Sequence, residues 1–232
     1  MSITIKRLKL AVKHLLGKDL YLKPDQRTAT RFYGSPYGGW ALPEGVVNAG
    51  SIIYSFGIGE DVSFDLALIE ATGCRVFGFD PTPKSLRWVE GNVREHKFVI
   101  RPWALGASDG ELELWLPKNP EHVSASCRPS EATSHDSFVA ECKSLESVMR
   151  ELDHAKVDVL KMDIEGAEYE VLRSLANGAV LDRIGHLLVE FHHWMPSFRR
   201  EDTLSAIRSL KGRGWVIQWV SESGHEVLFG RS

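Results

Sequence analysis

From residue 51 onward, short apolar runs alternate with stretches in which apolar residues recur at intervals of three and four positions. Runs rich in β-branched and aromatic residues predict buried strands, whereas the three-and-four spacing predicts amphipathic helices. We expect strands over residues 52–56, 75–79, 98–100, 111–116, 157–162, 186–191, 215–220 and 226–229. Helices are expected over residues 64–71, 83–89, 145–152, 167–176 and 203–210.

The regular alternation of strands and helices predicts the fold class. Strands joined through helices run parallel, and a parallel sheet needs helices on both of its faces. The last two strands follow each other without a helix, so they predict an antiparallel pair. We therefore expect an α/β three-layer sandwich, with a mostly parallel seven-stranded sheet and an antiparallel terminal hairpin.

The first 45 residues follow a different pattern, and we divide the chain into residues 1–45 and residues 46–232. Within residues 1–20, apolar positions recur at helical spacing among five lysine and arginine side chains. We interpret this segment as a basic helix packed on its own domain. The alternative is a helix that lies on an anionic membrane surface.

Two stretches are expected to be irregular and to shape a ligand pocket. Residues 24–45 contain seven prolines and glycines. The same stretch holds four aromatic side chains, which either fill the side of a core or wall a ligand site: Phe32, Tyr33, Tyr37 and Trp40. Residues 117–137 are polar and rich in proline and serine, and a loop of this length inside a compact domain usually has a function.

Composition narrows the classes of function. The chain has 232 residues, and 28 basic against 31 acidic side chains give a net charge of −3. Dedicated nucleic-acid binders usually carry a basic excess, so we expect no nucleic-acid partner. Three cysteines without metal-ligand spacing argue against a disulfide scaffold and fit a reducing, cytoplasmic location. No apolar run approaches the roughly 18 residues of a membrane span.

A glycine-rich turn separates the strand at residues 52–56 from the helix that follows it. Gly57 and Gly59, with Phe56 beside them, would let a ligand approach the backbone at the carboxyl end of the sheet. Asp80 ends the next strand, 21 residues after Gly59, where an acidic residue commonly holds ribose hydroxyls. Each feature alone is also compatible with an ordinary turn.

The residues after this turn favour one cofactor over another. The dinucleotide-binding fingerprint requires a third glycine, but Val62 occupies that position. Glu60 and Asp61 also place two carboxylates at the start of the helix, where they would repel a pyrophosphate. An adenosine ligand with a positive charge and no phosphate would not be repelled. The pattern points to S-adenosylmethionine, whose sulfonium is cationic, rather than to a nicotinamide cofactor.

Two further segments are candidates for cofactor contacts. Trp103 and Ala104 follow the third strand, where the indole ring could wall an adenine with the Ala104 amide nearby. The alternative for Trp103 is an ordinary core aromatic. Ser63, just past the glycine turn, could hydrogen-bond the cofactor carboxylate or could simply begin the helix.

The run over residues 157–168 carries the strongest chemical signal. Its strand ends at Met162, and Asp163 and Glu165 follow beside the predicted cofactor crevice. Acids at a strand tip are costly to bury without a purpose, although they could also cap the following helix. We assign Asp163 and Glu165 as catalytic candidates, and Asp163 also as a cofactor contact.

The strand at residues 186–191 is expected to end close to Asp163, and two histidines follow it. His192 is the candidate general base, because an imidazole titrates near neutral pH. His193 points the other way if the alternation of the strand continues. Neither the spacing nor the composition requires a divalent metal among these groups, and we assign no metal ligand.

A resemblance to a known family rests on these same segments. The run Lys161-Met162-Asp163-Ile164-Glu165-Gly166-Ala167-Glu168 resembles the signature of FkbM-type methyltransferases. Asp80 after an apolar strand, the segment 103–108 and the strand end at 189–192 are similar to the same family. The resemblance implies a class I, Rossmann-like methyltransferase domain over residues 46–232. It also implies S-adenosylmethionine as cofactor and, usually, O-methylation of a sugar or another small molecule.

One position departs from the family pattern. The family usually reads Asp-x-Gly-Ala-Asn-x-Gly in the first loop, and the opening aspartate is replaced here by Ser55. Glu60 or Asp61 could take over contacts to the methionine amine. The departure leaves the individual contacts open but not the class of cofactor.

These patterns identify neither the methyl acceptor nor the oligomeric state. The interpretation that fits most observations is an S-adenosylmethionine-dependent methyltransferase that O-methylates a small molecule such as a sugar. The alternatives are a nicotinamide-dependent oxidoreductase and a non-catalytic binding module of the same fold. The acids at one strand tip argue against the binding module, which has no need of them.

Overall fold

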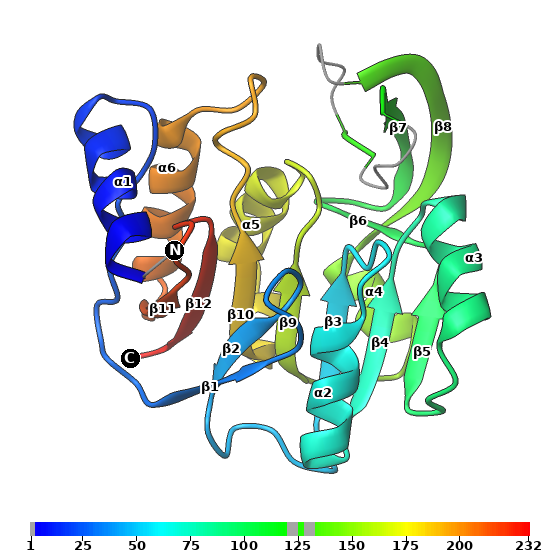
Figure 1. The fold of residues 1–232 in the computed structure, drawn as a ribbon. Helices are drawn as coiled ribbons and strands as arrows, with labels where there is room; N and C mark the ends of the chain where they lie inside the picture. Colours follow the sequence, from blue (N-terminus) through cyan, green and yellow to red (C-terminus); the bar gives the residue numbers. More distant parts are fainter. Residues whose placement is uncertain (1–2, 120–124, 128–132) are drawn as a thin grey trace.

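The centre of the protein is a seven-stranded sheet, seen in a computed structural model that describes residues 3–119, 125–127 and 133–232 (Figure 1). Its order is β11 (Trp215–Val220), β12 (Glu226–Arg231), β10 (Ile184–Glu190), β9 (Val157–Met162), β3 (Ile52–Phe56), β4 (Arg75–Phe79) and β5 (Phe98–Arg101). Neighbouring strands from β10 to β5 run parallel, whereas β12 is antiparallel to both β10 and β11. The predicted sheet with its terminal hairpin is confirmed.

Helices cover both faces of this sheet, which makes three layers. One face carries α4 (Leu145–Glu151), α5 (Glu168–Asn177) and α6 (Arg200–Lys211), and the other carries α2 (Ser63–Thr72) and α3 (Pro83–Asn92). Successive strand residues belong to different cores: Ile53 packs with α2, whereas Tyr54 packs with α4 and α5. This alternation is the pleat of a strand buried on both sides, and it explains the apolar runs in the sequence.

The N-terminal region begins with α1 (Ile3–Leu15), on the side of the molecule that carries β11 and β12 (Figure 1). Leu10 is buried against the turn between these two strands, whereas Leu8, Val12 and Leu15 are exposed. Over residues 7–15, whose side chains the structure describes, Leu10 therefore docks the helix while other apolar side chains stay on the surface. Membrane contact and the domain boundary at residue 45 stay predictions.

The interpretation of residues 24–45 as wholly irregular was wrong. β1 (Thr30–Tyr33) and β2 (Trp40–Pro43) form an antiparallel hairpin in which Tyr33 pairs with Trp40. The glycines and the first two prolines of this stretch lie in its turn or outside it, and Pro43 ends a strand, where a proline is tolerated. Because glycine and proline usually mark turns, the two short strands between them were not predicted.

A separate three-stranded sheet lies beside the main one, in the order β6 (Ala104–Gly106), β8 (Thr133–Ser144) and β7 (Gly110–Pro117). The prediction of a loop over residues 117–137 was therefore wrong from Thr133 onward, and Ser126 also bridges to Trp115. Much of β8 is exposed, so its polar composition resembles that of a loop. The rest of that prediction, over residues 120–124 and 128–132, lies outside the described residues.

In the part of the chain that the structure describes, no helix is both long enough and apolar enough to cross a lipid bilayer.

Candidate active site

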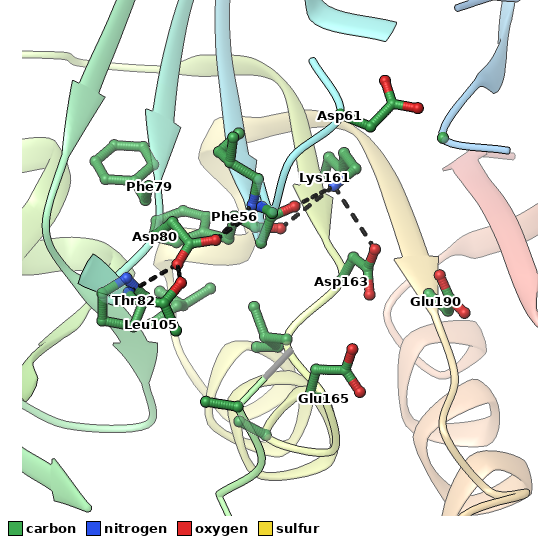
Figure 2. A pocket seen from close by; sticks show the side chains of 18 of the residues that line it. Phe56, Asp61, Phe79, Asp80, Thr82, Leu105, Lys161, Asp163, Glu165 and Glu190 are labelled. Atoms are coloured by element: carbon green, nitrogen blue, oxygen red, sulfur yellow. Dashed lines mark hydrogen bonds and ion pairs between the residues drawn. The ribbon is translucent and has the colours of Figure 1, made fainter. Parts of the chain in front are cut away.

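A cavity of about 710 Å³ opens at the carboxyl ends of β3, β4, β9 and β10. Ligands of open parallel sheets bind at this edge. Nine of the eleven predicted site residues line it: Phe56, Gly57, Gly59, Asp61, Asp80, Trp103, Ala104, Asp163 and Glu165. The other two, Ser63 and His192, do not line the cavity, but they contact the lining residues Asp61 and Asp163. Figure 2 shows the labelled part of this lining.

The glycine turn is packed tightly on one side and open on the other. Gly57 has a φ of 78°, and a Cβ there would lie 1.7 Å from the carbonyl oxygen of Asp163. Only glycine fits such a position. Gly59 has a φ of 59°, but a Cβ there would meet no atom within 4 Å. The backbone at Gly59 is therefore accessible to a ligand, as the sequence predicts.

Asp80 anchors this turn. Its Oδ2 accepts hydrogen bonds from the backbone N–H groups of Ile58 (3.0 Å) and Gly59 (2.9 Å). Its Oδ1 accepts from the backbone N–H of Thr82 (2.8 Å) and from the hydroxyl of the same residue. All four acceptor positions of the carboxylate are occupied by the chain itself (Figure 2). A ribose contact by Asp80 stays a prediction, and it would have to share these oxygens.

An apolar wall faces the glycine turn. Trp103 is buried and stacks on Phe79, with ring centroids 6.0 Å apart and an angle of 23° between the planes. Lys143 places its Nζ 4.1 Å from the centre of the Trp103 ring. Trp103 is thus a core aromatic and a lining residue at once. Ala104 and Leu105 continue this wall from β6.

The β1–β2 hairpin closes the site from the side of α2. Its turn is held by Asp61, which accepts a hydrogen bond from the hydroxyl of Ser35 (2.9 Å) and one from the backbone N–H of Ser63 (2.7 Å). Ser63 in turn accepts a bond from the backbone N–H of Ser35 (2.8 Å). Burial favours a higher pKa for Asp61, but the bonds from Ser63 and Ser35 outweigh it and lower the pKa.

This link brings two aromatic residues of the hairpin, Tyr37 and Trp40, to the cavity wall. The prediction that the aromatic stretch walls a ligand site is supported for these two residues. The cofactor contact of Ser63 stays a prediction, because its hydroxyl serves the hairpin.

A group of acids surrounds one histidine where β9 and β10 end. We call Asp163, Glu165, Glu168, Glu190 and His192 the acid–histidine cluster. The Nε2 atom of His192 lies 3.5 Å from Glu165 Oε2, 3.6 Å from Asp163 Oδ1 and 3.9 Å from Glu190 Oε1. The sequence prediction that the tips of β9 and β10 meet is confirmed by these distances.

Glu168 organises the cluster, and the sequence analysis gave it no role. It is fully buried, and its Oε1 faces both the backbone N–H (3.1 Å) and the ring Nδ1 (3.0 Å) of His192. Its Oε2 accepts a hydrogen bond from the backbone N–H of Gly166 (2.9 Å). The signal that could have found it is the third acid of the run, since helix capping needs only one.

The cluster changes the protonation of His192. Burial works against the charged imidazole, but Glu168, Glu165 and Asp163 together raise the pKa of His192 to about 10. At neutral pH the ring is therefore an imidazolium with no free lone pair to accept a proton. The role of general base stays a prediction for His192, and its surroundings favour that of a fixed cation.

The turn between β9 and α5 is strained. Glu165 adopts a φ of 52°, in the left-handed region, and Gly166 has a φ of 104°. A Cβ on Gly166 would lie 2.1 Å from the ring of Phe198. Left-handed conformations of residues other than glycine cost about 1–3 kcal/mol and gather at functional sites. The strain holds the Glu165 side chain within reach of His192.

Two further features of this wall are the cation of Lys161 and the raised pKa of Glu190, a member of the cluster. Lys161 donates from Nζ to the carbonyl oxygen of Gly57 (2.8 Å) and lies 4.0 Å from Asp163 Oδ2 (Figure 2). Burial and the neighbouring charge of Asp163 raise the pKa of Glu190 to about 9, against the opposing charge of His192. Glu190 also lies directly across from Glu226 in the β10–β12 pair. A carboxyl with this pKa is protonated at neutral pH.

The cavity as a whole is acidic. Among the described residues its lining holds one lysine, Lys161, and seven acids: Glu60, Asp61, Asp80, Asp163, Glu165, Glu190 and Glu226. Such a lining attracts a cation and repels a pyrophosphate. Asp163, Glu165 and His192 are also close enough, within 4.8 Å, to hold a metal ion. The expectation that no metal is needed stays a prediction.

Comparison with known proteins decides the family. The profile of the Methyltransferase FkbM domain matches residues 51–217, which is more than half of the chain. The chain belongs to the FkbM methyltransferase family. The resemblance inferred from the Lys161–Glu168 run is thereby confirmed, and S-adenosylmethionine is the cofactor of this methyltransferase fold.

Individual relatives match parts of the chain. The human "Probable methyltransferase-like protein 24" is 31% identical over 157 residues, 67% of this chain and 36% of its own length. "Hexuronic acid methyltransferase AglP" of Haloferax volcanii is 27% identical over 126 residues, 54% of this chain and 51% of its own length. The chain thus spans about a third to a half of the relatives it matches.

A solved structure is also similar to this chain. The crystal structure of Aeropyrum pernix fibrillarin in complex with natively bound S-adenosyl-L-methionine aligns with a TM-score of 0.45 and 13% identity. The alignment covers 90% of this chain and 85% of the fibrillarin chain.

The residues present fit the family's cofactor. The backbone at Gly59 is open to the cavity, and the apolar wall of Trp103, Ala104 and Leu105 suits a purine ring. The acids of the opposite wall suit a positively charged sulfur and amine. The same acids would repel the phosphates of a nicotinamide cofactor. The oxidoreductase alternative therefore loses its support.

Proposed function

We propose that the chain is an O-methyltransferase that methylates a hydroxyl of a small, neutral, polar molecule such as a sugar. The observation that carries this proposal is the acidic wall formed by Asp163, Glu165 and Glu190 at the end of the cavity away from Trp103. Carboxyl groups there can bind the hydroxyls of a polyol and can accept the proton that a methylated hydroxyl must lose.

The cofactor would be held by groups already described. The Gly57–Gly59 turn offers its backbone, Trp103 and Ala104 offer an apolar wall for the purine, and Asp163 offers a carboxylate to the cationic end. When bound, S-adenosylmethionine supplies an electrophilic methyl group on a positively charged sulfur. The chain contributes orientation, which is worth about 7–11 kcal/mol in well-oriented reactions.

Three side chains of the acid–histidine cluster take distinct roles in this proposal. Asp163, whose side chain is 31% exposed to the cavity, accepts the proton of the acceptor hydroxyl. His192 remains an imidazolium and fixes the surrounding carboxylates. Glu190, with a pKa raised to about 9, is neutral at neutral pH and donates a hydrogen bond to an acceptor oxygen.

The charge of the wall favours a neutral acceptor over an anionic one. A carboxylate or phosphate on the acceptor would face the acids Asp163, Glu165 and Glu226, and like-charge contacts cost several kcal/mol. The name of the AglP relative, a hexuronic acid methyltransferase, supports a carbohydrate acceptor. The lining of this chain favours the neutral members of that class.

A comparison of matched acceptors tests the proposal. Labelled methyl transfer from S-adenosylmethionine would be measured with a panel of methyl glycosides and with the uronates of the same sugars. We expect neutral glycosides to be methylated about tenfold faster or more, because the uronates meet like charges. Faster transfer to the uronates, or label recovered on a carboxyl group, would contradict the proposal.

The non-catalytic alternative is tested by the same assay. A protein that binds S-adenosylmethionine in calorimetry but transfers no label to any acceptor of a broad hydroxyl library would be a binding module. A cytoplasmic location is also part of the proposal, because none of Cys74, Cys127 and Cys142 forms a disulfide.

A further inference from the structure

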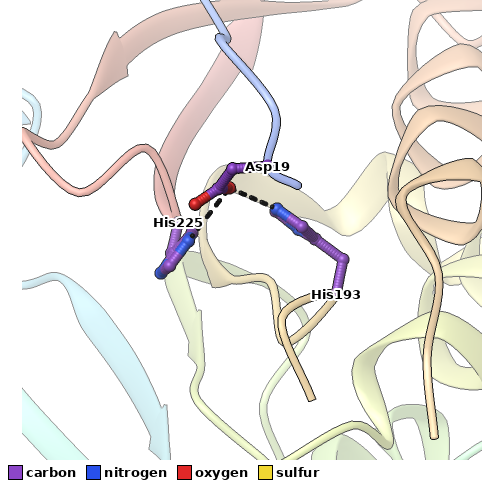
Figure 3. Close-up of side chains that lie close together, drawn as sticks. All are labelled: Asp19, His193 and His225. Atoms are coloured by element: carbon purple, nitrogen blue, oxygen red, sulfur yellow. Dashed lines mark hydrogen bonds and ion pairs between the residues drawn. The ribbon is translucent and has the colours of Figure 1, made fainter. Parts of the chain in front are cut away.

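A second group of metal-ligating side chains lies outside the cavity. Asp19 follows α1, His193 follows β10, and His225 lies in the turn between β11 and β12 (Figure 3). Asp19 and His193 are buried, and the side chain of His225 is 18% exposed. None of the three lines the cofactor cavity. The proposed methyl transfer does not use them.

Both imidazoles point at one carboxylate oxygen. His193 Nε2 lies 3.0 Å and His225 Nε2 lies 3.3 Å from Asp19 Oδ1 (Figure 3). The two rings stand nearly perpendicular, with an angle of 89° between their planes. All three ligand atoms lie within 4.8 Å of one another. Three segments far apart in the sequence therefore meet at a single point.

That oxygen is crowded beyond its capacity for hydrogen bonds. Asp19 Oδ1 also accepts a bond from the backbone N–H of Leu20 (2.8 Å). A carboxylate oxygen has two lone pairs, so three nitrogen donors would compete for two positions. The second oxygen, Oδ2, is approached by Lys13 Nζ at 3.5 Å. If the imidazoles instead turn lone pairs toward a shared cation, the competition disappears.

The spacing suits such a cation. Ligand atoms 2.0–2.1 Å from one ion in a tetrahedral arrangement lie about 3.3 Å apart. The measured separations of 3.0 and 3.3 Å from Asp19 Oδ1 are close to this value. A water molecule would be the fourth ligand, and the 18% exposure of the His225 side chain would give it access from solvent.

The ring nitrogen of His193 that does not face Asp19 contacts a chain of two hydroxyl groups. This Nδ1 atom lies 3.2 Å from Thr203 Oγ1, which in turn lies 3.1 Å from the hydroxyl of Tyr169. Histidines that bind metals commonly have the other ring nitrogen held in this way, which fixes the orientation of the ring. Tyr169 belongs to α5, directly after the buried Glu168 of the acid–histidine cluster.

From this geometry we propose that Asp19, His193 and His225 bind one divalent transition-metal ion of the zinc class. Two imidazoles and one carboxylate suit zinc, iron(II) or cobalt(II) better than magnesium or calcium. The bound ion would fasten the chain after α1 to the core of the domain. It would also fix the segment that carries His192, the neighbour of His193.

Zinc binding by the full 232-residue chain tests the proposal. The protein would be stripped with a chelator, dialysed, and titrated with zinc chloride at neutral pH by calorimetry, with metal content measured by mass spectrometry. We expect one zinc ion at this site and a thermal midpoint that rises with zinc concentration, since binding to the folded state stabilises it. No binding by the wild type would overturn the proposal.

Matched variants place the ion. His225→Gln and the isosteric Asp19→Asn should each weaken zinc binding by more than about tenfold, since even second-shell changes cost 10–100-fold. His96→Gln is the control, because this histidine side chain is 85% exposed and far from the group. Unchanged zinc affinity in a folded His225→Gln or Asp19→Asn protein would overturn the proposal. So would zinc binding that is lost only in Asp163→Asn, because the ion would then lie in the acid–histidine cluster.

Discussion

The two walls of the cavity are built on different principles. On the proposed cofactor side, the carboxylates of Asp80 and Asp61 accept hydrogen bonds from backbone and hydroxyl groups of the chain. On the proposed acceptor side, Asp163, Glu165 and Glu190 surround the Nε2 atom of His192. On the first side, carboxylates stabilise the backbone conformation through hydrogen bonds. On the second side, the packing of the chain holds ionisable groups close together.

This difference teaches where each kind of change should act. Substitutions on the cofactor side should alter stability and cofactor affinity together, because the hydrogen bonds there fix the backbone that would contact the cofactor. Substitutions on the acceptor side should alter turnover and its pH dependence, because the pKa values of Glu190 and His192 are raised there. Glu168 is the exception, since it is a buried acid that builds the acceptor side.

The largest effect is expected at Gly57. In Gly57→Ala the new Cβ would collide with the carbonyl oxygen of Asp163, 1.7 Å away, and the two walls would be forced apart. We expect a loss of at least about 3 kcal/mol in the free energy of unfolding and no measurable binding of S-adenosylmethionine. Urea denaturation and calorimetry would measure both.

The matched control for that change is Gly59→Ala. A Cβ at Gly59 meets no atom within 4 Å, so the variant carries only the strain of its positive φ, about 1–2 kcal/mol. Equal stability losses in the two variants would mean that the close approach at Gly57 does not hold the walls together.

The next effect concerns Asp163 on the acceptor side. In Asp163→Asn the shape is kept but the proton acceptor is lost, so turnover should fall by about 10²–10⁴-fold. Affinity for S-adenosylmethionine should also fall, by a smaller factor, because the cationic end of the cofactor loses the negative charge that it faces. Radiolabel transfer and calorimetry on the same preparation would separate the two quantities. A large loss of cofactor affinity with unchanged turnover at saturation would place Asp163 on the cofactor side instead.

Asp65 departs from the pattern of the cofactor side, because its carboxyl is buried beside Ser55, the residue that replaces the family's opening aspartate. Burial raises the pKa of Asp65 to about 6, although Lys161 and Ser55 oppose this. Folded Asp65 therefore keeps its proton at pH values where the unfolded chain, with a pKa near 3.8, has released it. Its contribution to stability falls as the pH rises through that window.

Asp65→Asn removes this pH dependence. Between about pH 4 and about pH 7, wild-type stability should fall by about 3 kcal/mol relative to the variant. Denaturation curves of both proteins across this range would show it. Parallel stability profiles would mean that Asp65 titrates normally.

The smallest effect is expected at Asp80. In Asp80→Ala the N–H groups of Ile58 and Gly59 lose their acceptor, and the turn that meets the cofactor loosens. We expect cofactor affinity to fall by about 1–3 kcal/mol. Stability should fall as well, because the same carboxylate is an internal anchor. Asp80→Asn keeps acceptor oxygen on one side and should be intermediate. Unchanged affinity in a folded Asp80→Ala protein would remove this residue from the site.

The fold was predictable where burial is strong. Apolar runs such as residues 52–56 and 157–162 are buried on both faces, so their composition alone reveals strands. The β1–β2 hairpin and β8 were missed because one is interrupted by glycine and proline and the other is exposed and polar. In both, tertiary pairing and not local composition decides the structure.

The candidate site was predictable in position but less so in the roles of its residues. Asp163 and Glu165 were found because they follow a buried strand. The protonation of His192 was not, because three carboxylates from a turn and a helix set it, and only packing brings them to one ring. The role of Glu168 depends in the same way on its complete burial.

The charge of His192 is the property on which the contrast between the two walls rests. Its ring resonances, assigned by comparison with a His192→Asn variant, would be followed by nuclear magnetic resonance as the pH is raised. We predict that the ring stays protonated well above pH 8, because its pKa is raised to about 10. A titration midpoint near the ordinary value of about 6.5 would contradict this, and would return His192 to the role of general base.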